Sequence, residues 1–409
     1  MAVADWKLQV GWEGLIAGKL HFSLTDPFFG SADVFESQWT EFFTGDHDDV
    51  TDDVAEGSTV AWSRGSDALV QAQIESGQMT FQLLNAATPY LYDPNDSRSP
   101  LYGSADVMRP VRLIASLDGW ATTLGAHYGF ISEIDYDPDT FTASVTCQDI
   151  TATWMNRTRP IVALQTGITS SAAIRLVLQA LGFSDPSYME LEPAPAITSM
   201  NFSADGTQYA IALLGAILDA ERGTCWVDGN GVFHFEGRYA RDAKGTPSYD
   251  FETSLVGLTS KRALDLIGNR ALVTAGSGIQ QIALDNASKQ RYGEADIASV
   301  SSNYIPDDIH ARDLAALLVA RAKDAHPPQV ATIDNDTDAT IAAQLGVDVN
   351  QRVTVNGADC FVERVDQALA AGGQKLVTTL TTTEAPTVGT LLFSSTLPAF
   401  TTDGSRAFG

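Results

Sequence analysis

The sequence predicts a mostly β protein of the α+β class, in which two β-rich regions flank a small α/β module. Most of the chain runs in short segments of alternating apolar and polar residues interrupted by Gly, Pro, Asn and Asp, as in antiparallel sheets. Residues 161–240 instead place apolar residues at helical spacing. The length of 409 residues corresponds to about two to four domains.

The first β-rich region contains strands with clear turn signals. Residues 79–83 alternate between apolar and polar, and residues 111–115 follow Pro110, which is typical of an edge strand. Residues 130–136 and 141–147 flank an Asp-Pro-Asp sequence, so together they predict a hairpin.

Two helices are predicted in the central module. Thr169 or Ser170 can cap the first, which stops at Gly182, and Asp205 or Thr207 can cap the second. Their apolar residues recur at i, i+3, i+4 and i+7, so each helix has one face to bury.

The rest of the chain returns to strands after one more helix. Residues 224–235 predict a hairpin around a turn with two glycines, and a helix is predicted from about residue 308 to residue 324. Three C-terminal strands follow, at residues 352–357, 360–365 and 375–380. After Pro386 the chain has too little apolar mass for a core of its own, so we expect this tail to pack on a neighbour.

These elements divide the chain into consecutive segments. They are an N-terminal β extension (1–49), a first β domain (50–160), the α/β module (161–240), a second β domain (241–385) and a C-terminal tail (386–409). Because the two β domains share a texture of short strands and turns, we expect them to resemble each other.

The charge balance argues against several classes of function. The chain has 25 Lys and Arg against 51 Asp and Glu, a net charge of −26. A protein that holds nucleic acid by neutralising phosphates needs the opposite excess. The acidic balance favours solubility, or a surface that repels a polyanion. The N-terminus has no basic and apolar leader and no stretch approaches 18 apolar residues, so we expect neither Sec export nor a membrane span.

Two acidic segments are candidate metal sites, and both are better explained otherwise. The run 46–53 is rich in Asp, but one contiguous loop rarely converges on a cation, so a solvated loop is favoured. Residues 334–338 start like an EF-hand loop, yet Ala339 and Leu345 stand where such a loop needs Gly and Glu.

No motif supports catalysis. Cys147, Cys225 and Cys360 form no C-x-x-C pair and are expected to be buried and inert, and the sequence contains neither a G-x-S-x-G elbow nor a P-loop. Three carboxylates stand at alternate positions, Glu133, Asp135 and Asp137. They could suggest the acid and base pair of a glycoside hydrolase, but the solvent-exposed face of a hairpin is the favoured interpretation. The sequence therefore predicts no catalytic, cofactor-binding or metal-binding residue.

Five sequence blocks occur in a characteristic order in the first β-rich region. They are Trp62-Ser63-Arg64-Gly65, residues 77–85, Tyr92-Asp93-Pro94-Asn95, Ser99-Pro100-Leu101-Tyr102 and residues 109–113. This order resembles the opening of minor tail proteins of bacteriophages with long, non-contractile tails. The resemblance continues through the module and covers about residues 50 to 382, although residues 86–91 lengthen one gap and residues 1–45 match nothing in the family.

The resemblance implies a tail-hub, tail-associated or baseplate-hub-like protein at the distal end of the tail tube. In such hubs, two tube-like antiparallel β-barrel domains per chain form a pseudo-sixfold ring as a homotrimer. In this chain, residues 50–160 and 241–385 would form the two tube-like β-barrel domains. The resemblance further implies a structural virion protein that is not an enzyme and uses no cofactor.

The same resemblance implies a set of partners and a location. The partners are further copies of the chain, a distal tail or tube protein, the tape measure protein, and a tip fibre or receptor-binding protein. DNA would pass through the channel as transient cargo during ejection, and this chain would not insert into a membrane. The location would be the distal end of the virion tail, after assembly in the host cytoplasm.

Two other functions stay open. One is a carbohydrate-binding or cell-wall-cleaving β protein of the tail tip, and the other is a hexameric distal-tail ring subunit. A ring-forming trimer without glycan affinity would favour the hub, whereas a monomer that cleaves cell-wall polymer would favour the enzyme. Chain length favours the hub over the hexamer, because two tube-like domains per chain are needed to pass from six subunits to three.

Overall fold

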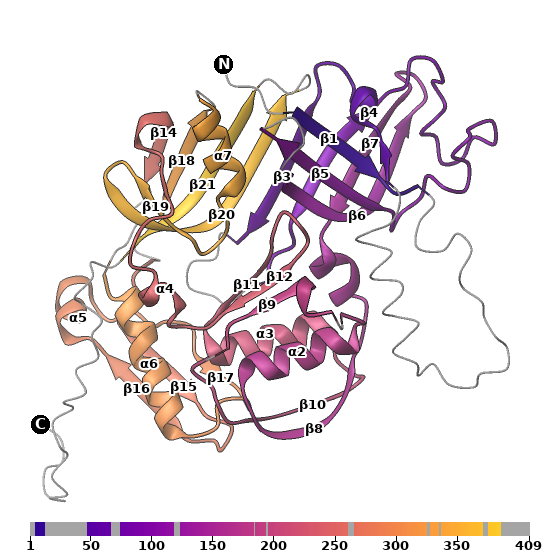
Figure 1. Ribbon diagram of the computed structural model, residues 1–409. Helices are drawn as coiled ribbons and strands as arrows, with labels where there is room; N and C mark the ends of the chain where they lie inside the picture. The colour runs from indigo at the N-terminus through magenta and orange to yellow at the C-terminus, as the bar shows by residue number, and fades with distance from the viewer. Residues whose placement is uncertain are drawn as a thin grey trace, which may run out of the picture.

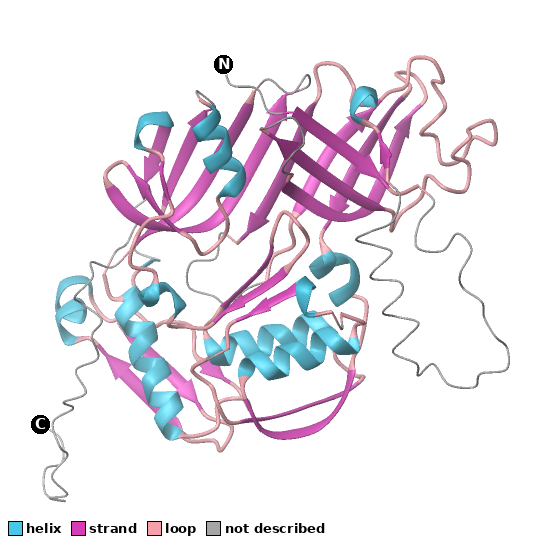
Figure 2. Cartoon of the chain, viewed as in Figure 1, coloured by secondary structure: helices cyan, strands magenta, loops and turns pink. Residues whose placement is uncertain are grey.

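The computed structural model describes residues 5–12, 47–66, 74–117, 123–183, 185–193, 195–260, 266–324, 328–334, 337–370 and 375–385. These residues form two layers, with a large curved sheet at the top of Figure 1 and a lobe of helices and small sheets beneath it. Figure 2 shows that most helices belong to this lower lobe. The predicted mostly β, α+β class is confirmed.

The large sheet contains 13 strands in the described part of the chain, in the order β14-β18-β21-β20-β3-β4-β7-β6-β5-β1-β2, with β19 beside β20 and β13 beside β19. Their bounds are β1 (Asp5–Val10), β2 (Asp48–Asp49), β3 (Thr59–Gly65), β4 (Gln78–Leu83), β5 (Pro110–Ser116), β6 (Leu124–Asp137), β7 (Thr142–Gln148), β13 (Tyr249–Asp250), β14 (Leu255–Ser260), β18 (Gln329–Asp334), β19 (Arg352–Val355), β20 (Ala358–Ala370) and β21 (Leu376–Glu384). All pairs are antiparallel except β13 with β19. Two short 3₁₀ helices, η1 (Thr51–Asp53) and η4 (Glu252–Ser254), accompany this sheet.

The two β-rich regions of the sequence are joined inside this sheet. Strand β3 pairs with β20 from Gly65 opposite Arg364 to Thr59 opposite Ala370. At this seam the Trp62 indole donates a 2.8 Å hydrogen bond to the Gln367 amide oxygen. The strand order stays open, with β14 and β2 at its two ends.

The predicted strands of the first region are confirmed. In β4, Met79, Phe81 and Leu83 are buried and alternate with exposed residues, and β6 and β7 form the predicted hairpin. The edge position expected after Pro110 is wrong. Strand β5 lies between β6 and β1, because Asp5–Val10, part of the segment assigned as an N-terminal β extension, pairs along its outer side.

The lower lobe comprises residues 151–243 and 266–322. Its helices are the π-helical turn η2 (Thr151–Met155), η3 (Pro186–Tyr188), α2 (Ser170–Ala180), α3 (Ala210–Glu221), α4 (Ala240–Ala243), α5 (Asn286–Tyr292) and α6 (Asp308–Ala322). Among the described residues, the lobe contains three small sheets. The first pairs β8 (Ile161–Ile168) with β10 (Met200–Asp205), and the second contains the hairpin β11 (Thr224–Val227) and β12 (Phe233–Glu236) with β9 (Met189–Leu191) beside β12. The third has the strand order β16 (Gln280–Leu284), β15 (Arg270–Thr274) and β17 (Val300–Ser301).

Helix α2 begins as predicted, but α3 does not. The Thr169 hydroxyl accepts the Ala172 N–H at 3.1 Å and so caps α2. Helix α3 starts after Tyr209, without a side-chain cap. Asp205 instead accepts the N–H and hydroxyl of Thr207, at 3.0 and 2.6 Å, in a separate turn before the helix.

Residues 266–322 lie outside the large sheet, although the sequence placed them in the second β-rich region. Helix α6 covers β15 and β16, and Val273 and Leu314 belong to the same apolar cluster as Leu214 of α3. The segment therefore shares the core of the lower lobe. The second β-rich region contributes to the sheet only through β13, β14 and β18–β21.

One helix that the sequence pattern missed packs on the sheet. Helix α7 (Asp338–Gly346) begins after Thr337, whose hydroxyl accepts the Thr340 N–H at 3.1 Å. Ile341 and Leu345 lie in the core of the first β-rich region. In the EF-hand-like start at 334–338, Asp334 ends β18 and Thr337 and Asp338 begin α7, whereas residues 335 and 336 lie outside the described residues.

Candidate functional site: the junction between the sheet and the lower lobe

The three hairpin carboxylates lie where the sequence placed them. Glu133, Asp135 and Asp137 all point to the exposed face of β6. Across the described ranges, no three His, Cys, Asp or Glu side chains gather in a way that would hold a metal ion. None of the helices described is long and apolar enough to cross a membrane.

The acidic run from residue 46 is more than the solvated loop that the sequence predicted. Asp48 and Asp49 are exposed but form strand β2 opposite β1. Asp53 accepts hydrogen bonds from the Tyr92 hydroxyl and, at 2.9 Å, from the Asn85 amide. Burial and the Asp53 carboxylate raise the pKa of Tyr92 above its usual value. Asp53 therefore ties this segment to the loop after β4.

The cysteines are free and buried, as predicted. Burial raises the pKa of the Cys147 and Cys225 thiols, so the reactive thiolate form of each is disfavoured.

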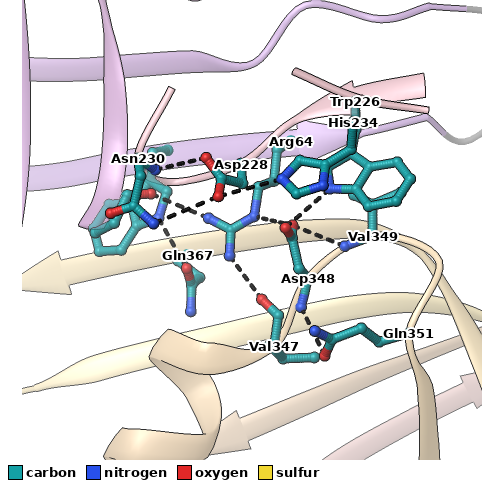
Figure 3. A network of polar contacts seen from close by, with 12 residues as sticks. Arg64, Trp226, Asp228, Asn230, His234, Val347, Asp348, Val349, Gln351 and Gln367 are labelled. Atoms are coloured by element: carbon teal, nitrogen blue, oxygen red, sulfur yellow. Dashed lines mark hydrogen bonds and ion pairs between the residues drawn. The ribbon is translucent and has the colours of Figure 1, made fainter. Parts of the chain in front are cut away.

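A network of polar side chains centred on Arg64 joins the large sheet to the lower lobe (Figure 3). Arg64 lies on β3, and its side chain is 6% exposed. Its Nε donates to Asp348 at 2.7 Å, and its other two nitrogens donate to the carbonyls of Val347 and Ala126 at 2.7 and 3.1 Å. These extra hydrogen bonds offset part of the cost of burying the ion pair. Arg64 thus joins β3, β6 and the loop after α7.

Asp348 continues this network into the lower lobe. Its second carboxylate oxygen accepts a 2.9 Å hydrogen bond from the indole nitrogen of Trp226 on β11. The first oxygen also accepts the Val349 N–H at 2.8 Å. Because both oxygens have donors, the carboxylate is held in one orientation.

His234, on β12, stacks on the Trp226 indole. The ring centroids are 4.9 Å apart and the planes differ by 7°. Its Nε2 lies 3.3 Å from an oxygen of Asp228, and its Nδ1 lies 3.4 Å from an oxygen of Glu190. Figure 3 shows the stack beside the Asp348 carboxylate.

The tip of the β11–β12 hairpin meets the start of β6 backbone to backbone. A Cβ added at Gly125 would lie 2.2 Å from the Asn230 side-chain oxygen and 2.6 Å from the Gly229 carbonyl. A Cβ at Gly229 would lie 2.1 Å from the Gly125 carbonyl. Glycine is therefore required on both sides of this contact.

A second ionic network lies beside the first. Arg241, after β12, donates to both oxygens of Glu363 on β20 at 2.6 and 2.7 Å. Burial opposes the charge of Glu363, but the Arg241 guanidinium outweighs it and lowers the pKa of Glu363. Lys244 pairs with Glu236 at 2.6 Å and donates to the Asn350 carbonyl at 2.9 Å.

An open cleft of about 510 Å³ separates the two networks and is lined by Trp226, His234, Lys244, Asp348 and Arg352, among others. The cations of this cleft already have carboxylate partners, since Lys244 pairs with Glu236, and Arg352 pairs with Asp359 at 2.6 Å. The arrangement thus serves as a joint between two parts of the chain.

Sequence patterns indicated only part of this joint. The hairpin of residues 224–235 and the block containing Arg64 were both singled out, but not as contacting segments. Asp348, which links them, lies 284 residues from Arg64 and had no pattern of its own. Asp348 lies two residues after the end of α7, a helix that the sequence pattern did not indicate.

Comparison with known proteins places this architecture among phage tail proteins. No protein-family model matches the sequence, and no curated protein is significantly similar to it. The fold is similar to that of the tail protein from Neisseria meningitidis MC58, with a TM-score of 0.54, 11% identity, and coverage of 93% of this chain and 96% of that one.

Two prophage proteins are similar to the same extent. The prophage MuSo2 43 kDa tail protein from Shewanella oneidensis has a TM-score of 0.53 and 11% identity, over 83% of this chain and 95% of that one. Prophage tail protein gp18 from Listeria monocytogenes EGD-e has a TM-score of 0.50 and 10% identity, over 83% and 92%. The chain therefore has a phage tail protein fold, and the resemblance identified from its sequence is confirmed at that level.

Proposed function

We propose that this chain is a structural subunit of a phage tail, a trimeric hub at the distal end of the tail tube. The observation that carries the proposal is the fold itself, which matches tail proteins over nearly their whole length. In this proposal residues 50–160 and 241–385 supply the two tube-like units of each chain, the latter through β13, β14 and β18–β21.

The open sheet supports a ring-forming role. Among the described residues β14 pairs with β18 alone, and Val256 on β14 is 62% exposed. An unpaired edge with apolar side chains is a template for pairing with another chain. Three copies, each with two β units joined at the β3–β20 seam, would present six units around the axis.

The partners follow from this position. One face of the ring would bind a distal tail or tube protein, and the other face would bind a tip fibre or receptor-binding protein. The ring would also bind the end of the tape measure protein. DNA would cross the channel only during ejection. With a net charge of −26, we expect the inner wall to carry more Asp and Glu than Lys and Arg, so that phosphates find no deep minima in transit.

The test is the mass of the purified chain in solution, combined with electron microscopy of the particle. A ring of three chains supports the hub. Val256→Lys should prevent the ring while the chain stays folded, because a charge on the edge blocks strand pairing. Ile282→Lys, at a residue that is 59% exposed on β16 of the lower lobe, is the matched control and should leave the ring intact.

Other outcomes would reject the hub. A ring of six chains would indicate a distal-tail ring subunit, and a monomer that binds or cleaves cell-wall polymer would indicate a tip enzyme. A ring of three with a basic or neutral inner wall would reject the conduit argument and leave the hub assignment intact.

A further inference from the structure

His234 is surrounded by charged groups from several elements. Three carboxylates face it, from the β11–β12 turn, from β9 and from the loop after α7, and these are Asp228, Glu190 and Asp348. The cations near the cleft are Arg64, Lys244 and Arg352, which pair with Asp348, Glu236 and Asp359 respectively. The immediate surroundings of the ring are therefore anionic.

Both ring nitrogens of His234 face a carboxylate, at 3.3 and 3.4 Å. Neither contact has hydrogen-bond geometry, and Nε2 has no hydrogen-bond partner among the described residues, so the attraction to these carboxylates is that of an ion pair and exists only when the ring is protonated. The His234 side chain is 16% exposed and that of Asp228 is 17% exposed, so their interaction is only partly screened by solvent. Glu190 is 80% exposed and contributes less.

We propose that His234 is a pH-sensitive clamp, which holds the β11–β12 hairpin and β9 against the sheet when its ring is protonated and loosens the junction when the ring is neutral. The clamp acts through Trp226, because the ring that stacks on the indole also positions the indole N–H on Asp348. Loss of the charge removes the attraction of the ring to Asp228 and Glu190 within the lobe and to Asp348 across the junction, where Asp348 keeps its ion pair with Arg64. This property goes beyond the proposed function and does not depend on it.

The direction of the pH dependence follows from the charges. Burial lowers the pKa of His234, but the Asp228 carboxylate beside Nε2 and the surrounding carboxylates outweigh burial, so the pKa is raised above 6.5. The stabilisation is therefore fully present below pH 6.5 and is lost as the pH rises through the folded-state value. We expect a tight junction at mildly acidic pH and a looser one at alkaline pH.

Hydrogen–deuterium exchange of the full chain tests the clamp. Exchange of peptides covering the β11–β12 hairpin and β9 is compared at pH 6 and pH 9, after correction for the intrinsic chemical rate, with β20–β21 as the internal reference. We expect about two- to tenfold faster exchange at pH 9, since one pKa unit corresponds to a factor of ten. In His234→Gln the exchange should be fast at both pH values.

Two further variants keep the proposal falsifiable. Glu190→Gln changes an exposed residue, so the chain will fold, and it should move the wild-type transition to lower pH. His310→Gln removes a histidine that pairs with Asp307 at the start of α6, at 2.8 Å, and should leave the hairpin transition unchanged. Equal protection of the wild-type hairpin at both pH values would overturn the clamp, as would a transition that persists in His234→Gln.

Discussion

The lower lobe and its junction with the sheet are stabilised by different kinds of contact. Inside the lobe, Ile174 of α2 and Leu214 of α3 are completely buried in one apolar cluster. At the junction, Arg64, Asp348 and Trp226 form a chain of directional hydrogen bonds. Apolar burial is non-directional and tolerates small shifts, whereas a buried ion pair depends on geometry and on charge. We therefore expect the lobe to keep its own fold when the junction is broken.

Arg64→Ala tests this difference most severely. It removes one partner of a buried ion pair and leaves Asp348 uncompensated, so we expect a loss of about 3–5 kcal/mol. Unfolding by denaturant, followed by Trp fluorescence, should separate into two transitions as the sheet and the lobe uncouple. Arg98→Ala is the control, because Arg98 is 72% exposed and solvent screens its pair with Asp96, so the change should leave the unfolding transition where it is in the wild type. A single, unshifted transition in Arg64→Ala would show that the junction is held by other contacts.

Leu214→Ala tests the apolar side of the comparison. Leu214 is 0% exposed, so its truncation should cost about 2–5 kcal/mol in the free energy of unfolding. Unlike Arg64→Ala, it should destabilise the lobe without changing exchange at the junction. Leu164→Ala, at a residue that is 67% exposed, should stay within about 0.5 kcal/mol. A cost below about 0.5 kcal/mol at Leu214 would contradict the burial of this face of α3.

Gly125→Ala tests whether the hairpin tip needs its close backbone approach to β6. The new Cβ would lie 2.6 Å from the Gly229 carbonyl, so the hairpin must move, at an expected cost of about 1–3 kcal/mol. Gly215→Ala is the matched control, since no atom lies within 4 Å of its added Cβ and α3 should gain about 0.5–1 kcal/mol. Faster exchange of the hairpin in Gly125→Ala alone would support the contact, and equal stability of both variants would argue against it.

The sequence predicted local elements better than their partners, for a physical reason. Alternation in residues 79–83 and turn residues around 137–139 act over a few positions, and the structure confirms both. The Arg64–Asp348 ion pair spans 284 residues, and the β3–β20 seam is comparably distant, so neither leaves a local pattern. A sequence periodicity identifies a buried face but does not identify what covers it.

The misplaced segments follow the same rule. Residues 241–385 were assigned to one β domain, but Val273 and Leu314 lie in the apolar cluster of the lower lobe, which no local pattern in residues 266–322 indicates. Helix α7 was missed because its Asp-rich entrance suggested a metal loop and because it buries only two apolar residues, Ile341 and Leu345. The joint itself had no sequence signal beyond the hairpin of residues 224–235 and the block that contains Arg64.

The smallest effect concerns polar contacts within the apolar lobe. Thr169→Ala removes the hydroxyl that caps α2 and should cost about 1 kcal/mol, because one N–H of the first turn loses its partner. Thr207→Ala is the control, since this hydroxyl bonds Asp205 in an exposed turn before α3 and not the helix itself, so its loss should stay within about 0.5 kcal/mol. Chemical denaturation of both variants, measured by circular dichroism, gives the comparison. If Thr169→Ala and Thr207→Ala lower the free energy of unfolding equally, the Asp205–Thr207 turn stabilises α3 as a cap would. That result would support the sequence prediction that Asp205 or Thr207 caps this helix. A larger cost for Thr169 alone would mean that a polar cap sets the start of α2, whereas α3, which has no side-chain cap, depends on packing.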